Sequence, residues 1–469
     1  MATRRSSRTL IGFKRLNDPD SIAEPLRAGY VALGSDFYEP ARLAGISAGA
    51  EKQLRAAGIE LVRTDPVFSL GQEGRAIQEL SAEKWDFLIV NVINWIEYRA
   101  ATRVLLAFRD RPMVLYSFGG FTEDGTLVSP AAGAGSTSLR FPLERWGVRF
   151  KYLFHGPDET MDVRGIVAFG RAAQAARKLR TARVGLVGWN DMGLYTTAFD
   201  VTRLRGQIGP EVESVDLLQV QRAMDALDRG EVAAEMKRVT ANWEYPTGKP
   251  STSSIEMAVR LYLATVEICR QKKFAAFSYK SVEGISLVLK VLHSIPSSLV
   301  AGAGIPYVDE NDVGNLVAEL MLKWISNGPV TFLEHYEHHP EWILLGVDGF
   351  VPEQMITGKP QIKRTDLLVE GIAHASVMRE GKLTLASLAE TGHGYRMHVA
   401  VGMGRAAPIW IEMGTQLPSW PSLKFYPDAS VRSILDHVLS QHFAAAYGDW
   451  TEELTDLCRL LDIEMVIDR

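Results

Sequence analysis

The chain has 469 residues, of which 46% are hydrophobic, 23% charged and 9% aromatic, a composition typical of a folded globular protein with roughly two to four domains. The 51 basic and 56 acidic residues give a formal net charge of -5 and are mixed along the chain, so nucleic acid is not an expected partner. The cysteines are Cys269 and Cys458 alone, which excludes a disulfide framework and a zinc site built mainly from thiolates.

The apolar segments are too short for a signal peptide or a membrane span. Residues 10–13 near the amino terminus are apolar but are followed at once by basic residues, unlike a secretory signal. The most apolar run, residues 85–96, is interrupted by Asp86, Asn91 and Asn94 and falls well short of the roughly 20 residues that cross a bilayer. We therefore expect a cytoplasmic protein without a membrane partner.

Residues 9–155 alternate between short apolar runs and helical patterns. The expected strands are residues 10–13, 59–63, 87–92 and 113–116, and the expected helices are residues 40–57 and 97–108. This alternation predicts a parallel sheet covered by helices. The glycine-rich segment 131–137 lacks the Gly-Lys-Ser/Thr ending of a phosphate-binding loop, so we expect a flexible or substrate-covering loop there.

A second αβ region follows, and the expected secondary structure then changes to short strands. The region contains expected helices at residues 163–179, 254–272, 285–294 and 315–326, and expected strands at 183–188 and 274–279. Beyond about residue 328, short β-like runs predominate, at residues 342–346, 382–388 and 395–401, before helices at 429–441 and 450–461. The sequence therefore predicts an α/β protein: an αβ domain over 1–155, a second over 156–327, and a β-rich carboxyl-terminal domain over 328–469.

Two aromatic or polar features allow more than one interpretation. His335, His338 and His339 lie among glutamates, but their irregular spacing matches no helical zinc motif, which favours a solvated loop over a metal cage. Trp95 follows the expected strand 87–92, where it could stack on a sugar face or pack as the start of a helix.

Acidic residues follow two consecutive strands of the second αβ region. Glu283 comes shortly after the expected strand 274–279, and Asp309, Glu310 and Asp312 follow the apolar run 304–308. The carboxyl edge of a parallel sheet is where open α/β folds bind their ligands. One acid there would be an ordinary helix cap, but acids at two strand ends indicate more than capping.

Converging carboxylates repel one another unless a cation lies between them. Oxygen-rich ligand sets favour magnesium or manganese over zinc, and a mixed carboxylate and imidazole site is the natural interpretation. His442 is the candidate imidazole, because it lies where the helical segment ending at residue 441 gives way to a run of small residues.

Four segments resemble the superfamily of L-fucose isomerase and L-arabinose isomerase. They are residues 183–200, with Met-Gly-Leu-Tyr at their core, residues 305–314, with Glu-Asn-Asp, the Thr-Leu-Ala segment at 382–386, and the histidine-containing segment 441–449. Members of this superfamily are metal-dependent aldose–ketose isomerases with two αβ domains and a β-rich domain. The resemblance spans residues 183–449, whereas residues 1–180 agree only in their αβ texture.

The resemblance implies Glu283, Asp312 and His442 as metal ligands, with Glu283 and Asp312 also transferring the proton. The implied cofactor is Mn²⁺ or another divalent ion such as Mg²⁺ or Co²⁺, and no redox cofactor is expected. The substrate-binding residues that we assign on this basis are Trp95, Trp189, Met192, Glu310, Asn311 and Asp348. Two departures bear on the substrate: the segment before Glu283 lacks the usual Cys-x-Pro-Glu, and Asp348 stands where many members have histidine.

The expected activity is aldose–ketose isomerisation of a sugar or sugar derivative through an enediol. A divalent ion near C1 and C2 favours loss of the C2 proton, and a carboxylate then moves that proton between the two carbons. A homo-oligomer, either a trimer or a hexamer, is implied by the resemblance. The alternatives are a sugar-binding or regulatory protein without catalysis, and another enediolate reaction at the same metal site.

Overall fold

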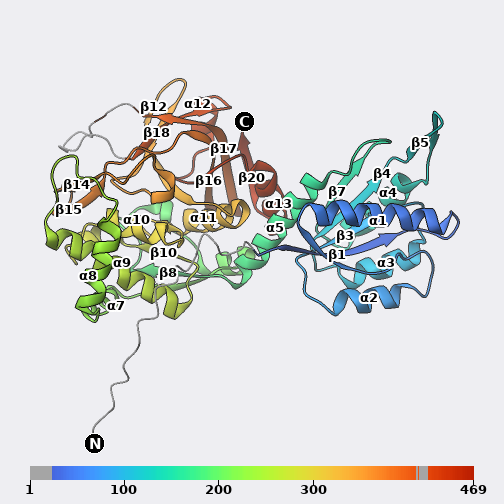
Figure 1. The fold of residues 1–469 in the computed structure, drawn as a ribbon, viewed down its shortest axis with the longest axis horizontal. Coiled ribbons are helices and arrows are strands. Elements are labelled where there is room, and N and C mark those ends of the chain that lie inside the picture. The colour runs from blue at the N-terminus through green and yellow to red at the C-terminus, as the bar shows by residue number, and fades with distance from the viewer. Residues whose placement is uncertain (1–23, 408–409, 411–420) are drawn as a thin grey trace, which may run out of the picture. The chain divides into compact units, whose positions relative to one another are not determined.

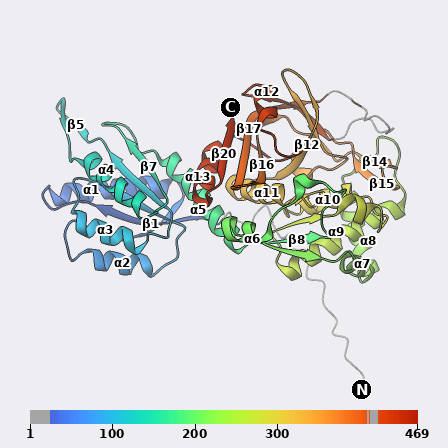
Figure 2. The same cartoon turned by 180° about the vertical axis from the view of Figure 1, so that it is seen from behind.

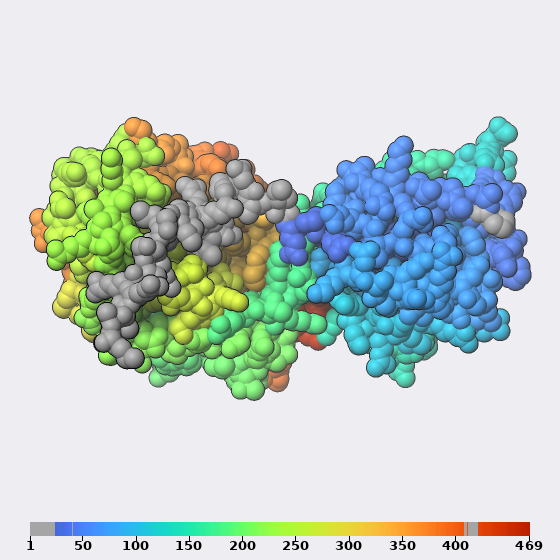
Figure 3. All heavy atoms as spheres, turned by 60° about the horizontal axis from the view of Figure 1, so that its bottom comes forward, coloured from blue at the N-terminus to red at the C-terminus, as the bar shows by residue number. Residues whose placement is uncertain are grey.

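The computed structural model describes residues 24–407, 410 and 421–469, which form two compact units. The amino-terminal unit consists of residues 24–181 and 450–465, and the large unit consists of the described residues of 182–449 with 466–469. Figure 3 draws the heavy atoms with residues 24–181 in blue to green and later residues in green to red. The expected strand 10–13 lies outside the described residues.

A five-stranded parallel sheet of order β2-β1-β3-β4-β7 forms the centre of the amino-terminal unit (Figure 1). Its strands are β1 (Leu26–Leu33), β2 (Ile59–Arg63), β3 (Phe87–Val92), β4 (Met113–Phe118) and β7 (Phe150–His155). Every residue of β3 and β4 is buried, as continuous apolar runs predict for strands covered on both faces. A small hairpin joins β5 (Phe121–Glu123) to β6 (Thr126–Val128). The expected parallel sheet is confirmed.

Helices of the amino-terminal unit match most of the predicted segments. They are α1 (Pro40–Ala56), α2 (Glu73–Ser81), α3 (Tyr98–Ala107), α4 (Ala132–Arg145), α5 (Val163–Thr181) and α13 (Thr451–Leu461). The loop expected at residues 131–137 is wrong, because α4 begins there. Its small residues allow close packing: a Cβ atom added at Gly135 would lie 2.8 Å from the carbonyl oxygen of Asn94.

The large unit contains a second parallel sheet, of order β11-β10-β8-β9. The strands are β8 (Arg183–Val187), β9 (Glu211–Val215), β10 (Ala276–Tyr279) and β11 (Tyr307–Val308). The helices of this part are α6 (Val201–Arg203), α7 (Leu217–Asp225), α8 (Arg229–Thr240), α9 (Thr252–Lys272), α10 (Ser294–Gly302) and α11 (Val313–Ser326).

The helix expected at residues 285–294 is wrong. A π-helical turn, η3 (Ser281–Ser286), covers only its first two residues, and α10 begins only at Ser294. Lys290 has a left-handed backbone with φ of 58°, which a continuous right-handed helix does not allow. The segment is an irregular connection in which Leu287 and Val288 are exposed, so its apolar spacing resembles that of a helix without forming one.

Strands after residue 329 form a closed barrel, which confirms the β-rich carboxyl-terminal part. The sheet order is β16-β19-β12-β13-β18-β17-β20, and pairing of β16 with β17 closes the ring. Its strands are β12 (Val330–His338), β13 (Ile343–Gly346), β16 (Gly381–Thr391), β17 (Gly394–Ala406), β18 (Ser422–Pro427), β19 (His442–Tyr447) and β20 (Glu464–Asp468). A hairpin of β14 (Ile362–Thr365) and β15 (Gly371–His374) and the helix α12 (Val431–His437) accompany it.

Helix α11 joins the two halves of the large unit. It packs against β10 and β11 of the parallel sheet and against β12, β16 and β19 of the barrel. Both views show α11 beside β16 (Figure 1 and Figure 2). The residues before α11 therefore lie where the carboxyl edge of the sheet meets the barrel. The sheet and the barrel belong to one compact unit. The domain boundaries expected at residues 155 and 327 stay predictions. In the described part of the chain, no helix is long and apolar enough to cross a membrane.

Candidate active site

The turn after β11 brings Asp309, Glu310 and Asp312 to the barrel. Glu310 and Asn311 are both left-handed, with φ of 60° and 58°, which is uncommon for residues other than glycine. The side chain of Asn311 donates hydrogen bonds to the carbonyl oxygens of Val187, at 2.9 Å, and Trp189, at 2.8 Å. These bonds tie the turn to the end of β8 and hold Glu310 in its unusual backbone conformation.

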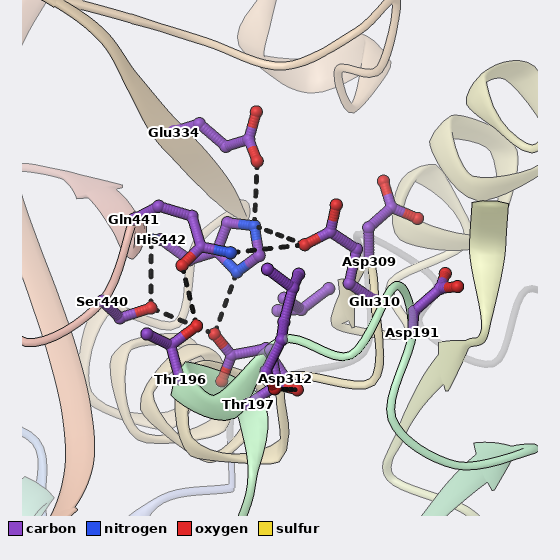
Figure 4. Close-up of polar contacts among 12 residues, drawn as sticks. Asp191, Thr196, Thr197, Asp309, Glu310, Asp312, Glu334, Ser440, Gln441 and His442 are labelled. Atoms are coloured by element: carbon purple, nitrogen blue, oxygen red, sulfur yellow. Dashed lines mark hydrogen bonds and ion pairs between the residues drawn. The ribbon is translucent and has the colours of Figure 1, made fainter. Parts of the chain in front are cut away.

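His442 is fully buried at the start of β19, and its two ring nitrogens have different partners (Figure 4). The Nε2 atom lies 3.1 Å from Oε1 of Glu334 and 3.6 Å from Oε2 of Glu310. The Nδ1 atom lies 2.9 Å from Oδ2 of Asp312. Glu334 and His442 are directly opposite each other in the antiparallel pair of β12 and β19, so their approach is set by strand register.

Asp312 caps helix α11 and contacts the Nδ1 atom of His442. Its carboxylate accepts hydrogen bonds from the backbone nitrogen of Asn315, at 3.0 Å, and from the side-chain nitrogen of Asn315, at 2.7 Å. Because the same carboxylate contacts His442 Nδ1, the opposite nitrogen of the ring faces Glu310 and Glu334. A carboxylate in this position orients a metal-binding histidine and raises its basicity.

Burial and mutual repulsion dominate the electrostatics of this cluster. Burial raises the pKa of Glu310 to about 8, with His442 opposing the rise and Glu334 adding to it. Burial also disfavours the charged form of His442, but hydrogen bonds with Asp312 and Glu334 outweigh that effect and raise its pKa well above the usual range. A divalent cation would relieve the repulsion between the two glutamates.

Glu310, Glu334 and His442 are the residues of this cluster that could hold a metal ion, since one ligand atom from each lies within 4.8 Å of the others. Glu334 was not predicted. The sequence favours a solvated loop for the acidic and histidine-rich segment that contains it. That interpretation is wrong for residues up to His338, which belong to β12. Alternation along β12 could have indicated it, because Phe332 and Glu334 share one face and His335 lies on the other, stacked 4.7 Å from Phe443.

Glu283 is separate from the glutamate and histidine cluster in its contacts. Its Oε2 atom accepts a hydrogen bond from the backbone nitrogen of Met192 at 3.2 Å and lies 2.6 Å from Nζ of Lys280. The hydrogen bond from Lys280, followed by that from Met192, lowers the pKa of the Glu283 carboxyl group. Its side chain is 46% exposed, so it is available to a ligand from solvent.

Buried Asp191, which was also not predicted, fixes the segment that carries Glu283. Its carboxylate accepts hydrogen bonds from the backbone nitrogens of Val282, at 2.8 Å, and Glu283, at 3.0 Å. Its neighbours Trp189 and Met192, which we expected to bind substrate, are 53% and 46% exposed. Trp189 packs against Phe199 with ring centroids 5.3 Å apart.

A cavity of about 230 Å³ opens beside the cluster. Its lining includes Met192, Asp309, Glu310 and Asp348, which the sequence singles out, and also Glu334. Of the predicted substrate-binding residues, Met192, Glu310 and Asp348 therefore share one cavity, while Asn311 is buried in the turn. Trp95 belongs to the amino-terminal unit, where it is 42% exposed.

Comparisons with known proteins identify sugar isomerases as relatives. The chain is 21% identical over 374 residues to a sulfoquinovose isomerase from Alkalicoccus urumqiensis, covering 76% of this chain and 80% of the relative. Sulfoquinovose isomerases from Priestia aryabhattai and Priestia megaterium are 18% identical over 416 residues, covering 83% of this chain and 86% of each relative. These relatives agree with the expected enzyme class, an aldose–ketose isomerase.

The other comparisons add little. No model of a known protein family matches the chain. A periplasmic solute-binding protein from Actinobacillus succinogenes with bound D-allose covers 64% of the chain at 15% identity. The TM-score of 0.15 is too low to indicate a shared fold.

Proposed function

We propose that this protein is a metal-dependent aldose–ketose isomerase of the L-fucose and L-arabinose isomerase superfamily. The observation that carries the proposal is the convergence of Glu310, Glu334 and His442 Nε2 beside a cavity at the carboxyl edge of a parallel sheet. The sugar isomerases among its relatives support the same reaction class.

We assign Glu310, Glu334 and His442 as the metal ligands and Asp312 as the residue that orients His442. This set differs from Glu283, Asp312 and His442, which the resemblance implies. The reason is that Asp312 contacts the other ring nitrogen of His442 and caps α11, while Glu283 contacts Lys280. Two carboxylate oxygens and an imidazole nitrogen suit Mn²⁺, and also Mg²⁺ or Co²⁺.

The proposed reaction needs a base that reaches C1 and C2 of the sugar. A bound divalent ion would supply Lewis-acid polarisation of the sugar oxygens. The Oε2 atom of Glu310 faces His442 and accepts a 3.3 Å hydrogen bond from Nε2 of Gln441, so Oε1 is the atom that takes the carbon-bound proton. Gln441 is itself held by Thr196, whose hydroxyl donates to Gln441 Oε1 at 2.9 Å.

Removal of the C2 proton by Glu310 gives an enediolate. A proton then moves from the C2 oxygen to the C1 oxygen, and Glu310 returns its own proton to C1, which completes the conversion of aldose to ketose. Such general acid–base help contributes roughly 10²- to 10⁴-fold to the rate. Glu283 is the second carboxylate available to the substrate, because it is half-exposed and contacts Met192 at the cavity.

Assay of the metal-free and Mn²⁺-loaded protein tests this proposal. Sulfoquinovose, a sugar with a sulfonate group, is the first substrate to try because the relatives are named for it, with neutral aldoses as controls. We expect isomerisation that requires metal and falls at least 100-fold in Glu310→Gln, consistent with loss of a general base. Bound metal without isomerisation of any sugar in the panel would favour the sugar-binding alternative and refute the proposal.

A further inference from the structure

A second group of potential ligands lies in the wall of the same cavity. His293 precedes α10, Asp309 follows β11 and Asp348 follows β13, and one ligand atom from each lies within 4.8 Å of the others. The His293 and Asp309 side chains are 2% and 7% exposed, while that of Asp348 is 24% exposed. All three residues line the cavity.

The distances within this group are long for hydrogen bonds. The Nε2 atom of His293 is 3.6 Å from Oδ2 of Asp309 and 3.4 Å from Oδ2 of Asp348. A charge-assisted hydrogen bond measures about 2.7–2.9 Å. Ligand atoms that share one ion, each about 2.1 Å from it, lie roughly 3.0–3.4 Å from one another. The observed separations are therefore closer to those around a shared cation.

The remaining polar atoms of His293 and Asp309 are already occupied. The Nδ1 atom of His293 lies 3.0 Å from Oγ of Ser286, and the hydroxyl group of Tyr307 donates to Oδ1 of Asp309. These are the outer contacts that fix metal-binding imidazoles and carboxylates. By contrast, Oδ2 of Asp309 is buried and has no hydrogen-bond partner among the described residues. Leaving such an atom unpaired is costly unless something occupies the space in front of it.

A third histidine and aspartate group has shorter contacts than the group of His293. The Oδ2 atom of Asp468 lies 2.7 Å from Nε2 of His398 and 3.1 Å from Nδ1 of His437. Those are ordinary hydrogen-bond lengths. The comparison shows that this chain can bring histidine and aspartate to hydrogen-bond distance, which the group of His293 does not reach.

We propose that His293, Asp309 and Asp348 form a second divalent-cation site, distinct from the site of Glu310, Glu334 and His442. One nitrogen and two carboxylate oxygens suit Mn²⁺ or Zn²⁺. Because Asp309 and Glu310 are adjacent and both line the cavity, a cation at each site would face the same ligand. The second cation would bind an oxygen substituent of a bound sugar that the first does not reach. The site itself does not depend on the proposed isomerase activity.

A protonated His293 between the two carboxylates is the competing arrangement. Burial disfavours that proton, but Asp309 and Asp348 outweigh burial and raise the pKa of His293 to about 9 in the absence of a cation. Counting the bound metal ions separates the two arrangements, because an imidazolium ion between the two carboxylates leaves no room for a cation.

The experiment is a Mn²⁺ titration of the metal-free full-length protein, with free Mn²⁺ measured by electron paramagnetic resonance and bound metal by elemental analysis. We expect two ions per wild-type chain, one in Asp348→Asn and one in His442→Ala. Asp348→Asn is the preferred variant because it keeps the shape of a partly exposed side chain, and circular dichroism checks its fold. His437→Gln, in the hydrogen-bonded group of His398, His437 and Asp468, is the matched control and should retain both ions.

An unchanged metal count in Asp348→Asn would overturn the second site, whether the wild-type chain binds one ion or two. The same titration treats the first site separately. A count that is unchanged in His442→Ala but lower in Asp348→Asn would support the second site and refute the metal assignment in the proposed function.

Discussion

Replacing Asp312 with asparagine distinguishes an orienting carboxylate from a metal ligand. The Oδ2 atom of Asp312 accepts hydrogen bonds from the side chain of Asn315, at 2.7 Å, and pairs with Nδ1 of His442 at 2.9 Å. In Asp312→Asn one of the two oxygens becomes an amide nitrogen that donates. Asparagine caps a helix about as well as aspartate does, so the start of α11 should persist.

The expected losses can be estimated from these contacts. At least one charge-assisted hydrogen bond is removed, which should lower the free energy of unfolding of the metal-free protein by about 1.5–3 kcal/mol. Loss of a carboxylate behind a metal-binding histidine weakens metal affinity about 10- to 100-fold. In Glu334→Gln a ligand itself is lost, so Mn²⁺ affinity should fall further. Its loss of stability should be smaller than that of Asp312→Asn. The weaker hydrogen bond to Nε2 of His442, now 3.1 Å, is partly offset by removal of a charge that adds to the raised pKa of Glu310.

Urea unfolding of both metal-free variants and Mn²⁺ titration of the same preparations measure the two effects. An orienting role predicts that Asp312→Asn loses stability and part of the metal affinity, whereas Glu334→Gln loses mainly metal affinity. If Asp312→Asn instead abolishes Mn²⁺ binding without loss of metal-free stability, Asp312 is a direct ligand, as the family resemblance implies, and our assignment is wrong.

Three further predictions concern the reaction, acid stability and assembly. Turnover in heavy water should place solvent deuterium in the product, and product without deuterium would indicate hydride transfer. Burial lowers the pKa of His374 from 6.5 to about 3, so the folded state keeps it neutral and stability is lost as pH falls from 6.5 towards 3; His374→Gln should reduce that slope by about 1.4 kcal/mol per pH unit in urea titrations at several pH values. Sedimentation should show a trimer or hexamer, and Trp95→Ala should raise KM; a fully active monomer or an unchanged KM would contradict this prediction.

Local pattern was enough to predict much of the fold. The continuous apolar runs of β3 and β4 predict strands that are buried on both faces, and those strands lie at the centre of the sheet. The same reasoning failed at Gly135, since small residues permit either a loop or a closely packed helix. It also failed between residues 285 and 294, where an irregular connection, partly exposed at Leu287 and Val288, has an apolar spacing close to that of a helix.

The sequence predicts Glu310, Asp312 and His442 as members of the candidate site, but not the contact between His442 and Glu334. The acids after β11 could be found because strand ends are visible in the sequence. The pairing of Glu334 with His442 could not, because it joins positions 108 residues apart through the register of β12 and β19. A long-range register depends on the closed barrel, and no local pattern contains it.

The three neighbouring residues of the Glu-Asn-Asp turn have different roles in the site. The amide nitrogen of Asn311 donates hydrogen bonds to the carbonyl oxygens of Val187 and Trp189. These bonds stabilise two successive left-handed residues, Glu310 and Asn311, each of which would otherwise cost about 1–3 kcal/mol. That conformation places Glu310 beside Nε2 of His442 while Asp312, two residues later, reaches Nδ1 of the same ring. The strain in the backbone is therefore part of how the cluster is built.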